Sequence, residues 1–324
     1  MRQLTLPGSD LRVSSLCLGI GQFGSGLGQE ISWRLLDAFV EAGGAFVDTA
    51  NVYGDWVPGL KSPSEKMLGA WLAGRGNRDQ VVLATKGGHP RLESMDVSRL
   101  APADLVHDVD ESLRHLQVEV IDLYWLHRDD PARPVGEIMQ TLADLAAVGK
   151  IRSIGCSNWR ADRIRAAQEY AAAQGLPGFV GDQMLWSMAA LNPNGLPDPT
   201  MVAMTPDLYG YHLQSGLAAI PYSSQANGLF QKLSDWRSRD RITPGQAARH
   251  PLAENQARLA RAQSLARDLG VSLTGIVLGY LQSQPFTTIP IIGCRTLDQL
   301  QDSLAGDGVR LSPEQLAFLE GGRE

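Results

Sequence analysis

Short apolar runs alternate along the chain with longer segments of helical periodicity. After an N-terminal stretch that suits a hairpin, the apolar runs are SLCLGIG, AFVDTA, VVLATKG, VIDLYWLH, IRSIGCSN, FVGDQML, LAAIPYS and TTIPIIG. Each is typical of a strand buried on both faces, and the segments between them often begin at Ser, Asp or Pro and end at Gly. Strand–helix alternation implies a parallel sheet, and eight units is the number that closes a barrel.

The pattern therefore predicts an α/β fold, a single (β/α)8 TIM barrel that spans residues 1–324 as one domain. A doubly wound open sheet also alternates in this way, so the count alone does not decide. No Gly/Ser-rich linker or low-complexity tract divides the chain. A last helix outside the repeat is expected from SPEQLAFLE, because Ser312 followed by Pro313 is typical of a helix start.

One long excursion, residues 189–216, interrupts the alternation between the sixth and seventh strands. Its first half is rich in proline and its second half is helical in pattern. Long segments at the C-terminal mouth of a barrel often form lids or pocket walls. A helix with an elaborated lead-in fits the same sequence, and both interpretations stay open.

A glycine motif near the N-terminus resembles a dinucleotide fingerprint. The sequence GIGQFG, residues 19–24, matches GxGxxG after a strand, and Asp48 ends the next strand. A Rossmann fold requires the helix to begin at these glycines, so that its amides meet the pyrophosphate. Here Gly26 and Gly28 follow, and helical periodicity begins only near Ser32. A glycine-rich loop at a barrel mouth explains the stretch better.

Composition limits the classes of partner and the compartment. The 324 residues have a formal net charge of −6 with no Lys/Arg block, so nucleic acid is not expected as a partner. No apolar run approaches the roughly 18 residues of a membrane span, and no signal peptide is visible, so we expect a cytoplasmic protein without a membrane partner. The three cysteines, Cys17, Cys156 and Cys294, lie far apart and are expected to be buried thiols.

Four polar residues lie at or just after the ends of buried strands. Asp48 ends AFVD, Tyr53 follows in the next loop, Lys86 ends VVLATK and His127 ends VIDLYWLH. Each residue alone is typical of a cap, a packed ring or a solvated charge. Together they favour a site, because an apolar strand seldom ends in a charged group without a partner. In a barrel the C-terminal strand ends converge on one mouth, where these residues would meet.

These residues suit carbonyl reduction. Reduction of a C=O group creates an alkoxide, which needs a proton from a nearby acid. A tyrosine has a pKa of about 10, and a neighbouring ammonium such as Lys86 would lower it. Asp48 would keep Lys86 charged and oriented, and His127 would hydrogen-bond the substrate oxygen or assist proton transfer. We expect Tyr53 to be the general acid.

With DTANVYG, LATKGG and DLYWLHRDD around these four residues, the sequence resembles the aldo-keto reductase superfamily over nearly its whole length. The resemblance implies a TIM barrel that binds NADP(H) across its mouth, without a Rossmann domain. It implies an enzyme that reversibly reduces an aldehyde, ketone or sugar carbonyl. By the same resemblance, the cofactor contacts are Ser157, Asn158, Gln183, Tyr222, Ser223, Ser224, Gly293, Arg295, Gln299 and Ser303.

Several positions depart from the family pattern. The residue before Gln183 is Asp182 where an asparagine is usual, and Ser303 replaces another asparagine. Of the basic residues that bind the 2′-phosphate in relatives, only Arg295 is present, so NADP(H) is expected while NAD(H) stays possible. The substrate-side candidates are Trp56, Trp125 and Trp186, of which we expect at least one to be core packing.

Two other functions are compatible with the fold. One is a regulatory module that senses bound nucleotide, and the other is a metal-dependent barrel enzyme. The second is disfavoured because no HxH pair or spaced carboxylate cluster lies at the strand ends, and no metal site is expected. The sequence HDVDE, residues 107–111, is interpreted as a solvated outer helix face. The physiological substrate, reaction direction and oligomeric state do not follow from the sequence.

Overall fold

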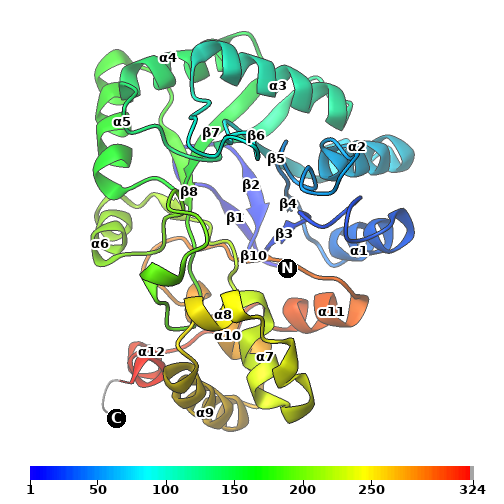
Figure 1. Cartoon of the computed structure of the whole chain (residues 1–324), viewed down its shortest axis with the longest axis vertical. Coiled ribbons are helices and arrows are strands. Elements are labelled where there is room, and N and C mark those ends of the chain that lie inside the picture. Colours follow the sequence, from blue (N-terminus) through cyan, green and yellow to red (C-terminus); the bar gives the residue numbers. More distant parts are fainter. Residues whose placement is uncertain (322–324) are drawn as a thin grey trace.

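The eight predicted strands form one curled sheet in the computed structural model, which describes residues 1–321 (Figure 1). Their order is β10-β3-β4-β5-β6-β7-β8-β9, and every neighbouring pair is parallel. The bounds are β3 (Cys17–Gly19), β4 (Phe46–Asp48), β5 (Val82–Gly87), β6 (Ile121–Leu126), β7 (Ile151–Ser157), β8 (Phe179–Gln183), β9 (Ala218–Ala219) and β10 (Ile291–Ile292).

The sheet closes between β9 and β10. Ala219 forms a parallel bridge with Thr288, and the Ile289 amide donates to the Ala219 carbonyl at 2.9 Å. The Ile291 amide continues the ladder by donating to the Pro221 carbonyl at 3.0 Å. These contacts agree with the predicted (β/α)8 barrel, and the C-terminal strand ends therefore converge on one mouth.

The predicted N-terminal hairpin is present and fills the opposite end of the barrel. It consists of the antiparallel strands β1 (Gln3–Thr5) and β2 (Arg12–Ser14). Leu6, Leu11 and Val13 pack with the lumen-facing side chains of the sheet, and all three are buried. The hairpin is fixed to the start of β4, where the Ser14 hydroxyl accepts hydrogen bonds from two backbone amides.

Helices surround the sheet in the order that the periodicity predicts, except that two short helices after the seventh strand were not predicted. In Figure 1, α1 and α2 lie to the right of the sheet, α3 and α4 above it and α5 to its left, while α7 to α10 and α12 are gathered below. The helices are α1 (Gln29–Glu41), α2 (Pro63–Arg75), α3 (Pro102–Leu116), α4 (Val135–Ala147), α5 (Ala161–Gln174), α6 (Pro206–Ser215), α7 (Leu229–Ser234), α8 (Pro244–Arg249), α9 (Leu252–Leu269), α10 (Leu273–Gln282), α11 (Leu297–Ala305) and α12 (Pro313–Glu320). Short 3-10 segments are η1 (Arg78–Gln80), η2 (Pro193–Gly195), η3 (Ala226–Gly228) and η4 (Trp236–Arg241). No helix within residues 1–321 has both the length and the apolar character to cross a bilayer.

Helix α1 begins too late for a Rossmann fold. Its first residue is Gln29 and its N-cap is Gly28, so the GIGQFG motif lies in an irregular loop before it. Gly21 in that motif packs against the Tyr53 ring, where an added Cβ would come within 3.3 Å of a ring carbon. The glycine-rich loop at the mouth is thus confirmed, and the glycine lets a candidate catalytic ring approach the backbone.

Other local predictions are also confirmed. Helix α12 starts at Pro313 after a capping box in which Ser312 and Gln315 exchange side-chain and backbone hydrogen bonds. The cysteines Cys17, Cys156 and Cys294 are all buried and free.

The 189–216 excursion contains a helix with an elaborated lead-in, one of the two structures that its sequence allowed. After η2, residues 202–204 run beside Leu185, with the Leu185 amide bonded to the Val202 carbonyl at 2.9 Å. The Met204 amide then donates to the Leu185 carbonyl at 3.0 Å. Helix α6 follows, N-capped by the Thr205 side chain. The excursion is therefore an irregular crossing of the barrel mouth that leads into the helix before β9.

Candidate active site

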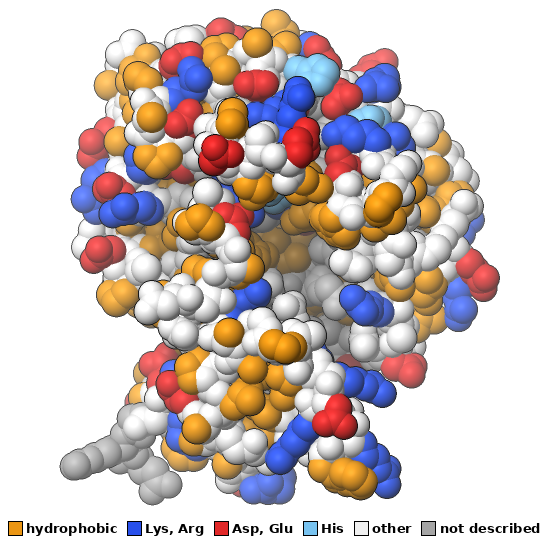
Figure 2. Space-filling model, in the orientation of Figure 1, with side chains coloured by type: hydrophobic (Ala, Val, Ile, Leu, Met, Phe, Trp, Pro, Cys, Tyr) orange, Lys and Arg blue, Asp and Glu red, His pale blue; other side chains and the backbone are white. Residues whose placement is uncertain are grey.

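Asp48, Tyr53, Lys86 and His127 converge at the mouth of the barrel. Figure 2 shows a hollow in the middle of this face of the molecule. Asp48 is the last residue of β4, Lys86 lies one residue before the end of β5, and His127 directly follows β6. Tyr53 lies in the turn after β4. The register of adjacent parallel strands brings the strand ends together, so sequence separations of up to 79 residues (from 48 to 127) become direct neighbours.

Lys86 is a buried ammonium held by two oxygen atoms. Its Nζ forms an ion pair with Asp48 Oδ2 and donates to the Thr49 carbonyl at 2.7 Å. The other Asp48 oxygen accepts from Gln183 Nε2 at 2.9 Å. Burial acts to lower the pKa of Lys86, but the charges of Asp48 and Tyr53 outweigh it and the pKa is raised. Lys86 is therefore charged at neutral pH.

The Tyr53 ring lies between the ammonium and the imidazole. Lys86 Nζ is 4.7 Å from the ring centroid, and the His127 ring meets the Tyr53 ring edge-on with centroids 5.6 Å apart. The Trp56 ring approaches from the other direction, with centroids 6.3 Å apart. Unlike Lys86 and Asp48, which are each 2% exposed, Tyr53 is only half-buried, so it borders the opening of the site.

His127 is held neutral by its surroundings. Burial lowers its pKa well below the usual value, and the positive charges of Arg128 and Lys86 act in the same direction. The His89 ring lies 4.7 Å away, and burial likewise lowers the pKa of His89, to about 4. His127 Nδ1 is buried without a hydrogen-bond partner in the described part of the chain. A neutral imidazole can donate from one nitrogen and accept at the other.

The predicted nicotinamide contacts lie beside this cluster. Asn158 follows β7 with a left-handed backbone (φ 61°), and its Nδ2 donates to the Ser157 hydroxyl at 3.0 Å and to the His127 carbonyl at 3.2 Å. Asn158 Oδ1 accepts from the Tyr222 hydroxyl at 2.7 Å. Gln183, fully buried, binds Asp48 through Nε2, whereas no atom of residues 1–321 hydrogen-bonds its Oε1.

The predicted phosphate-side loop follows Tyr222. Ser223 has a positive φ of 52°, and the buried Ser224 hydroxyl donates to the Ile291 carbonyl at 2.6 Å. That bond joins the loop after β9 to β10. The loop is thus held to the strand that precedes Gly293, another predicted contact, which is exposed and has open space where a side chain would be.

The predicted adenosine-side residues differ in accessibility. Arg295 and Gln299 are exposed at the start of α11, where the Arg295 amide donates to Gln299 Oε1 at 2.8 Å. Ser303, in contrast, is buried and accepts from Gln225 Nε2 at 3.0 Å. Lys232 was not identified from the sequence, yet burial and the charge of Arg295 both lower the pKa of Lys232. Two basic side chains thus lie near one another at this end.

The three tryptophans have different surroundings. Trp56 is 48% exposed at the mouth. Trp125 is fully buried in the lumen, facing inward like Lys86 across from it in the register, and its ring fills the space above Gly155. Trp186 packs among rings outside the lumen, including Tyr209 and Phe286. The expected core packing thus applies to Trp125, whereas Trp186 is half-buried and Trp56 is the most exposed of the three substrate-side candidates.

A buried polar network behind the sheet was not identified from the sequence. Glu65 of α2 is fully buried and accepts from the Thr85 hydroxyl at 2.6 Å and from His115 Nδ1 at 3.0 Å. Asn51 reaches the same carboxylate at 3.5 Å. Thr85 immediately precedes Lys86 and faces the opposite side of β5. The network therefore holds the strand that presents the lysine. The position of Glu65 in the first turn of a helix does not predict this network, because acidic residues are common there.

The interpretation of residues 107–111 as a solvated face holds for the exposed His107 and Asp110 but is wrong for Asp108. Asp108 is 2% exposed and accepts from both Arg99 nitrogens and from the Gly88 amide at 2.9 Å. The spacing Leu105, Asp108, Val109 and Ser112 on one buried helix face was a usable signal. His107, Asp108 and Glu111 lie close enough to share an ion, but Asp108 is already occupied by its partners.

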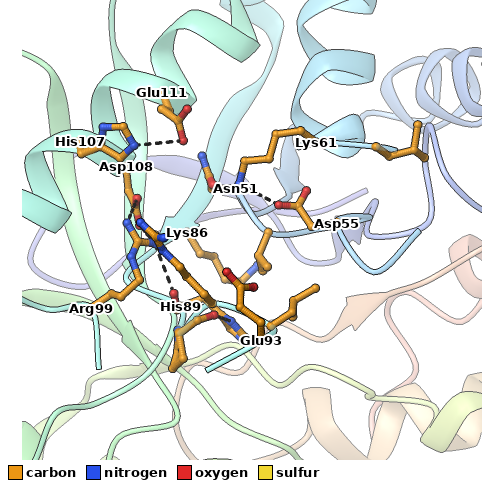
Figure 3. A pocket seen from close by; sticks show the side chains of 16 residues that line it. Asn51, Asp55, Lys61, Lys86, His89, Glu93, Arg99, His107, Asp108 and Glu111 are labelled. Atoms are coloured by element: carbon orange, nitrogen blue, oxygen red, sulfur yellow. Dashed lines mark hydrogen bonds and ion pairs between the residues drawn. The ribbon is translucent and has the colours of Figure 1, made fainter. Parts of the chain in front are cut away.

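These residues line a cavity of about 450 Å³ beside the cluster of Asp48, Tyr53, Lys86 and His127 (Figure 3). It lies between Lys86 and His89 on one side and α3 on the other. Its charges largely pair internally, as Lys61 does with Asp55 at 2.8 Å. The cavity is therefore polar yet offers little uncompensated charge to a ligand.

Comparison with known proteins identifies the family of this chain. A model of the Aldo/keto reductase family matches residues 15–322. The chain belongs to the aldo-keto reductase family. It is 32% identical over 329 residues to norsolorinic acid reductase of Emericella nidulans, covering 97% of this chain and 79% of that protein. It is 32% identical over 354 residues to aryl-alcohol dehydrogenase (NADP+) of Phanerodontia chrysosporium, covering 98% and 84%.

A third relative, norsolorinic acid reductase B of Aspergillus parasiticus, is 32% identical over 339 residues, a match that covers 100% of this chain and 84% of that protein. Because the family and these relatives are reductases or dehydrogenases, the aldo-keto reductase described here is an oxidoreductase enzyme. The family generally uses NAD(P)H and acts on small-molecule carbonyl compounds.

Proposed function

We propose that this aldo-keto reductase reduces aromatic aldehydes or ketones with NADPH, and that Tyr53 is the proton donor. The observation that supports this most directly is the position of the Tyr53 ring beside the charged Lys86 and the neutral His127. An ammonium at that position stabilises the phenolate that remains when Tyr53 gives up its hydroxyl proton.

The nicotinamide end of the proposed cofactor site fits the group that it would hold. Gln183 Oε1 is buried without a partner among the described residues, and a carboxamide NH2 is the kind of donor that would satisfy it. Asn158 and Ser157 offer further amide and hydroxyl groups nearby. Bound NADPH would supply the hydride. Arg295 and Lys232 would hold its 2′-phosphate, since both are cations at the adenosine end.

The protein's own groups account for the proton step. A substrate carbonyl oxygen between Tyr53 and His127 would accept a hydrogen bond from the neutral imidazole. As negative charge develops on that oxygen, Tyr53 Oη donates its proton to it. Asp48 keeps Lys86 charged throughout, because both carboxylate oxygens are already bound, one by Lys86 and one by Gln183. A fixed arrangement of this kind needs no reorganisation during the reaction.

The aromatic substrate class rests on two observations. The relatives include an aryl-alcohol dehydrogenase, whose name denotes an aromatic substrate. In this chain Trp56 exposes its ring at the mouth, edge-on to Tyr53. Flat rings stack favourably on such a surface, and a neutral substrate suits a pocket whose charges are paired internally.

The test is NADPH oxidation followed at 340 nm with aromatic aldehydes and ketones, aliphatic aldehydes and sugars, in wild type and Tyr53→Phe. We expect aromatic carbonyls to be turned over best. Tyr53→Phe should lose activity about 1,000-fold, within the usual range for a general acid, and retain NADPH binding. Tyr170→Phe, on the outer helix α5, is the matched control and should behave as wild type. NADPH binding without turnover of any compound would contradict the catalytic proposal and favour a nucleotide-sensing role.

A further inference from the structure

Arg128, the residue after His127, binds the 189–216 excursion. Its Nη2 lies 3.1 Å from Asp198 Oδ2, and its Nε donates to the Thr200 hydroxyl at 2.9 Å. The Thr200 hydroxyl in turn donates to Asp198 Oδ1 at 2.7 Å. Arg128 and Asp198 are only 12% and 17% exposed, so solvent screens this ion pair less than a surface pair.

The same part of the excursion reaches Asn158. The Val202 amide, four residues after Asp198, donates to Asn158 Oδ1 at 3.0 Å. The Val202 carbonyl is fixed from the other direction by the Leu185 amide at 2.9 Å. Residues 198–204 therefore span the distance from the loop after β6 to the amide side chain after β7.

Arg128 and Asn158, the two residues that the excursion joins, both bind the backbone of His127. The His127 carbonyl accepts from Arg128 Nη1 at 2.9 Å and from Asn158 Nδ2 at 3.2 Å. The Arg128 carbonyl accepts from Trp159 Nε1 at 3.2 Å. The guanidinium, the excursion and the Asn158 amide thus form a closed ring of hydrogen bonds around the backbone of His127.

We propose that Arg128 and Asp198 position the excursion so that the Val202 amide orients Asn158 for the nicotinamide carboxamide. This inference rests on the proposed function. A carbonyl oxygen has two lone pairs, and in Asn158 Oδ1 one is taken by Val202 and the other by the Tyr222 hydroxyl. Val202 fixes the amide plane, while the Tyr222 position is the one that a ligand donor can replace.

Arg128 and Asp198 are thus positioning residues, which act on NADPH through Val202 and Asn158. Without the ion pair the excursion loses its attachment beside His127, and the Val202 amide is no longer held against Asn158. Asn158 then has to be ordered when the cofactor binds, which weakens binding. The rate at saturating NADPH depends on Tyr53, Lys86 and His127 and should change much less.

The test compares Asp198→Asn with Asp10→Asn. Asp10 pairs with Arg152 at 2.9 Å, far from the mouth at the start of β7, and serves as the matched control. Thr200→Val removes the second Arg128 contact and serves as an independent variant should the first one be poorly folded. Each protein is measured for NADPH affinity by fluorescence titration, for hydrogen exchange of the Val202 amide without NADPH, and for kcat at saturating NADPH.

For Asp198→Asn and Thr200→Val we expect the NADPH Kd to rise about fivefold, Val202 exchange to accelerate about tenfold, and kcat to stay within about twofold. Asp10→Asn should change none of these. Unchanged Val202 exchange, or faster exchange with an unchanged NADPH Kd, would overturn the inference. Wild-type protein that fails to bind NADPH would instead refute the proposed function, while the exchange of Val202 would still report on the attachment of the excursion.

Discussion

The two ends of the proposed cofactor site differ sharply in burial. At the nicotinamide end, Asp48, Lys86, Asn158 and Gln183 are at most 3% exposed, and each is hydrogen-bonded to another member or to the backbone. At the adenosine end, Arg295 is exposed and its guanidinium makes no ion pair with any of residues 1–321. The side chains at the nicotinamide end are thus already fixed by hydrogen bonds, whereas those at the adenosine end are exposed to solvent.

This difference assigns separate tasks to the two ends. Charges and hydrogen bonds in a buried site are stronger, and removing one partner leaves the other uncompensated. Exposed charges are screened and interact with a ligand almost independently of their neighbours. Changes at the buried end should therefore damage catalysis and folding together, whereas changes at the exposed end should alter only affinity and nucleotide choice.

The largest effect is expected for Lys86→Met. Loss of the ammonium should lower kcat at least about 1,000-fold and lower the free energy of unfolding by about 3–5 kcal/mol, because Asp48 is left as a buried unpaired charge. The double variant Lys86→Met with Asp48→Asn removes that charge and should recover most of the stability but none of the activity. Chemical denaturation and NADPH oxidation measure the two. Equal instability of the single and double variants would contradict the assignment of the ion pair.

The buried histidines should give a pH dependence of stability. In the folded protein burial lowers the pKa of His89 from 6.5 to about 4, and that of His127 is lowered as well. Between pH 6.5 and 4 the unfolded chain binds protons that the native protein excludes. The histidines' contribution to the free energy of unfolding is therefore complete above pH 6.5 and is lost as the pH falls toward 4. Each histidine contributes a slope of about 1.4 kcal/mol per pH unit.

His89→Gln should reduce that slope by one proton while leaving stability at pH 7.5 close to wild type. Denaturant unfolding at pH 5.0, 5.5 and 6.0 gives the slopes directly. If the free energy of unfolding has the same pH slope in the variant and in wild type, His89 is protonated in the native protein as readily as in the unfolded chain. That result would contradict the proposal that His89 is neutral beside His127.

At the exposed end a smaller and more selective effect is expected. Arg295→Ala should raise the NADPH Kd about tenfold, the usual cost of one lost phosphate contact, and leave the NADH Kd unchanged. Lys232→Ala should act in the same direction. Arg12→Ala, in the hairpin at the far end of the barrel, is the control for net charge. An equal loss of NADPH and NADH affinity would place these cations at the pyrophosphate rather than at the 2′-phosphate.

Much of the fold and the four catalytic candidates followed from local pattern. The strand ends at Asp48, Lys86 and His127 are visible because each apolar run stops at a charged or polar side chain. The alternation of side chains along β6 also predicts which way Trp125 faces. Trp125 lies two residues before His127 and so faces the lumen with it, one layer deeper, as its complete burial shows.

What could not be predicted depends on contacts between distant segments. The Arg128–Asp198 pair joins residues 70 apart in the chain, and no local signal marks either one as a partner. Asp182, which departs from the family pattern, makes another contact of this kind. It is fully buried and faces away from the lumen, and its Oδ2 lies 3.4 Å from His212 Nε2 of α6. Only the packing of the excursion reveals this approach.

The smallest predicted effect concerns the Tyr222 hydroxyl and its influence on NADPH affinity. In the structure the Tyr222 hydroxyl donates to Asn158 Oδ1, the oxygen proposed to accept from the nicotinamide. Tyr222→Phe retains the ring for stacking and removes this competitor, so NADPH should bind about threefold more tightly, which corresponds to one weak hydrogen bond. Tyr222→Ala loses the ring as well and should bind NADPH more weakly than wild type. Fluorescence titration of the three proteins distinguishes the cases. Weaker binding by Tyr222→Phe would mean that the hydroxyl itself contacts the cofactor, and the buried end would then be complete only with Tyr222 in place.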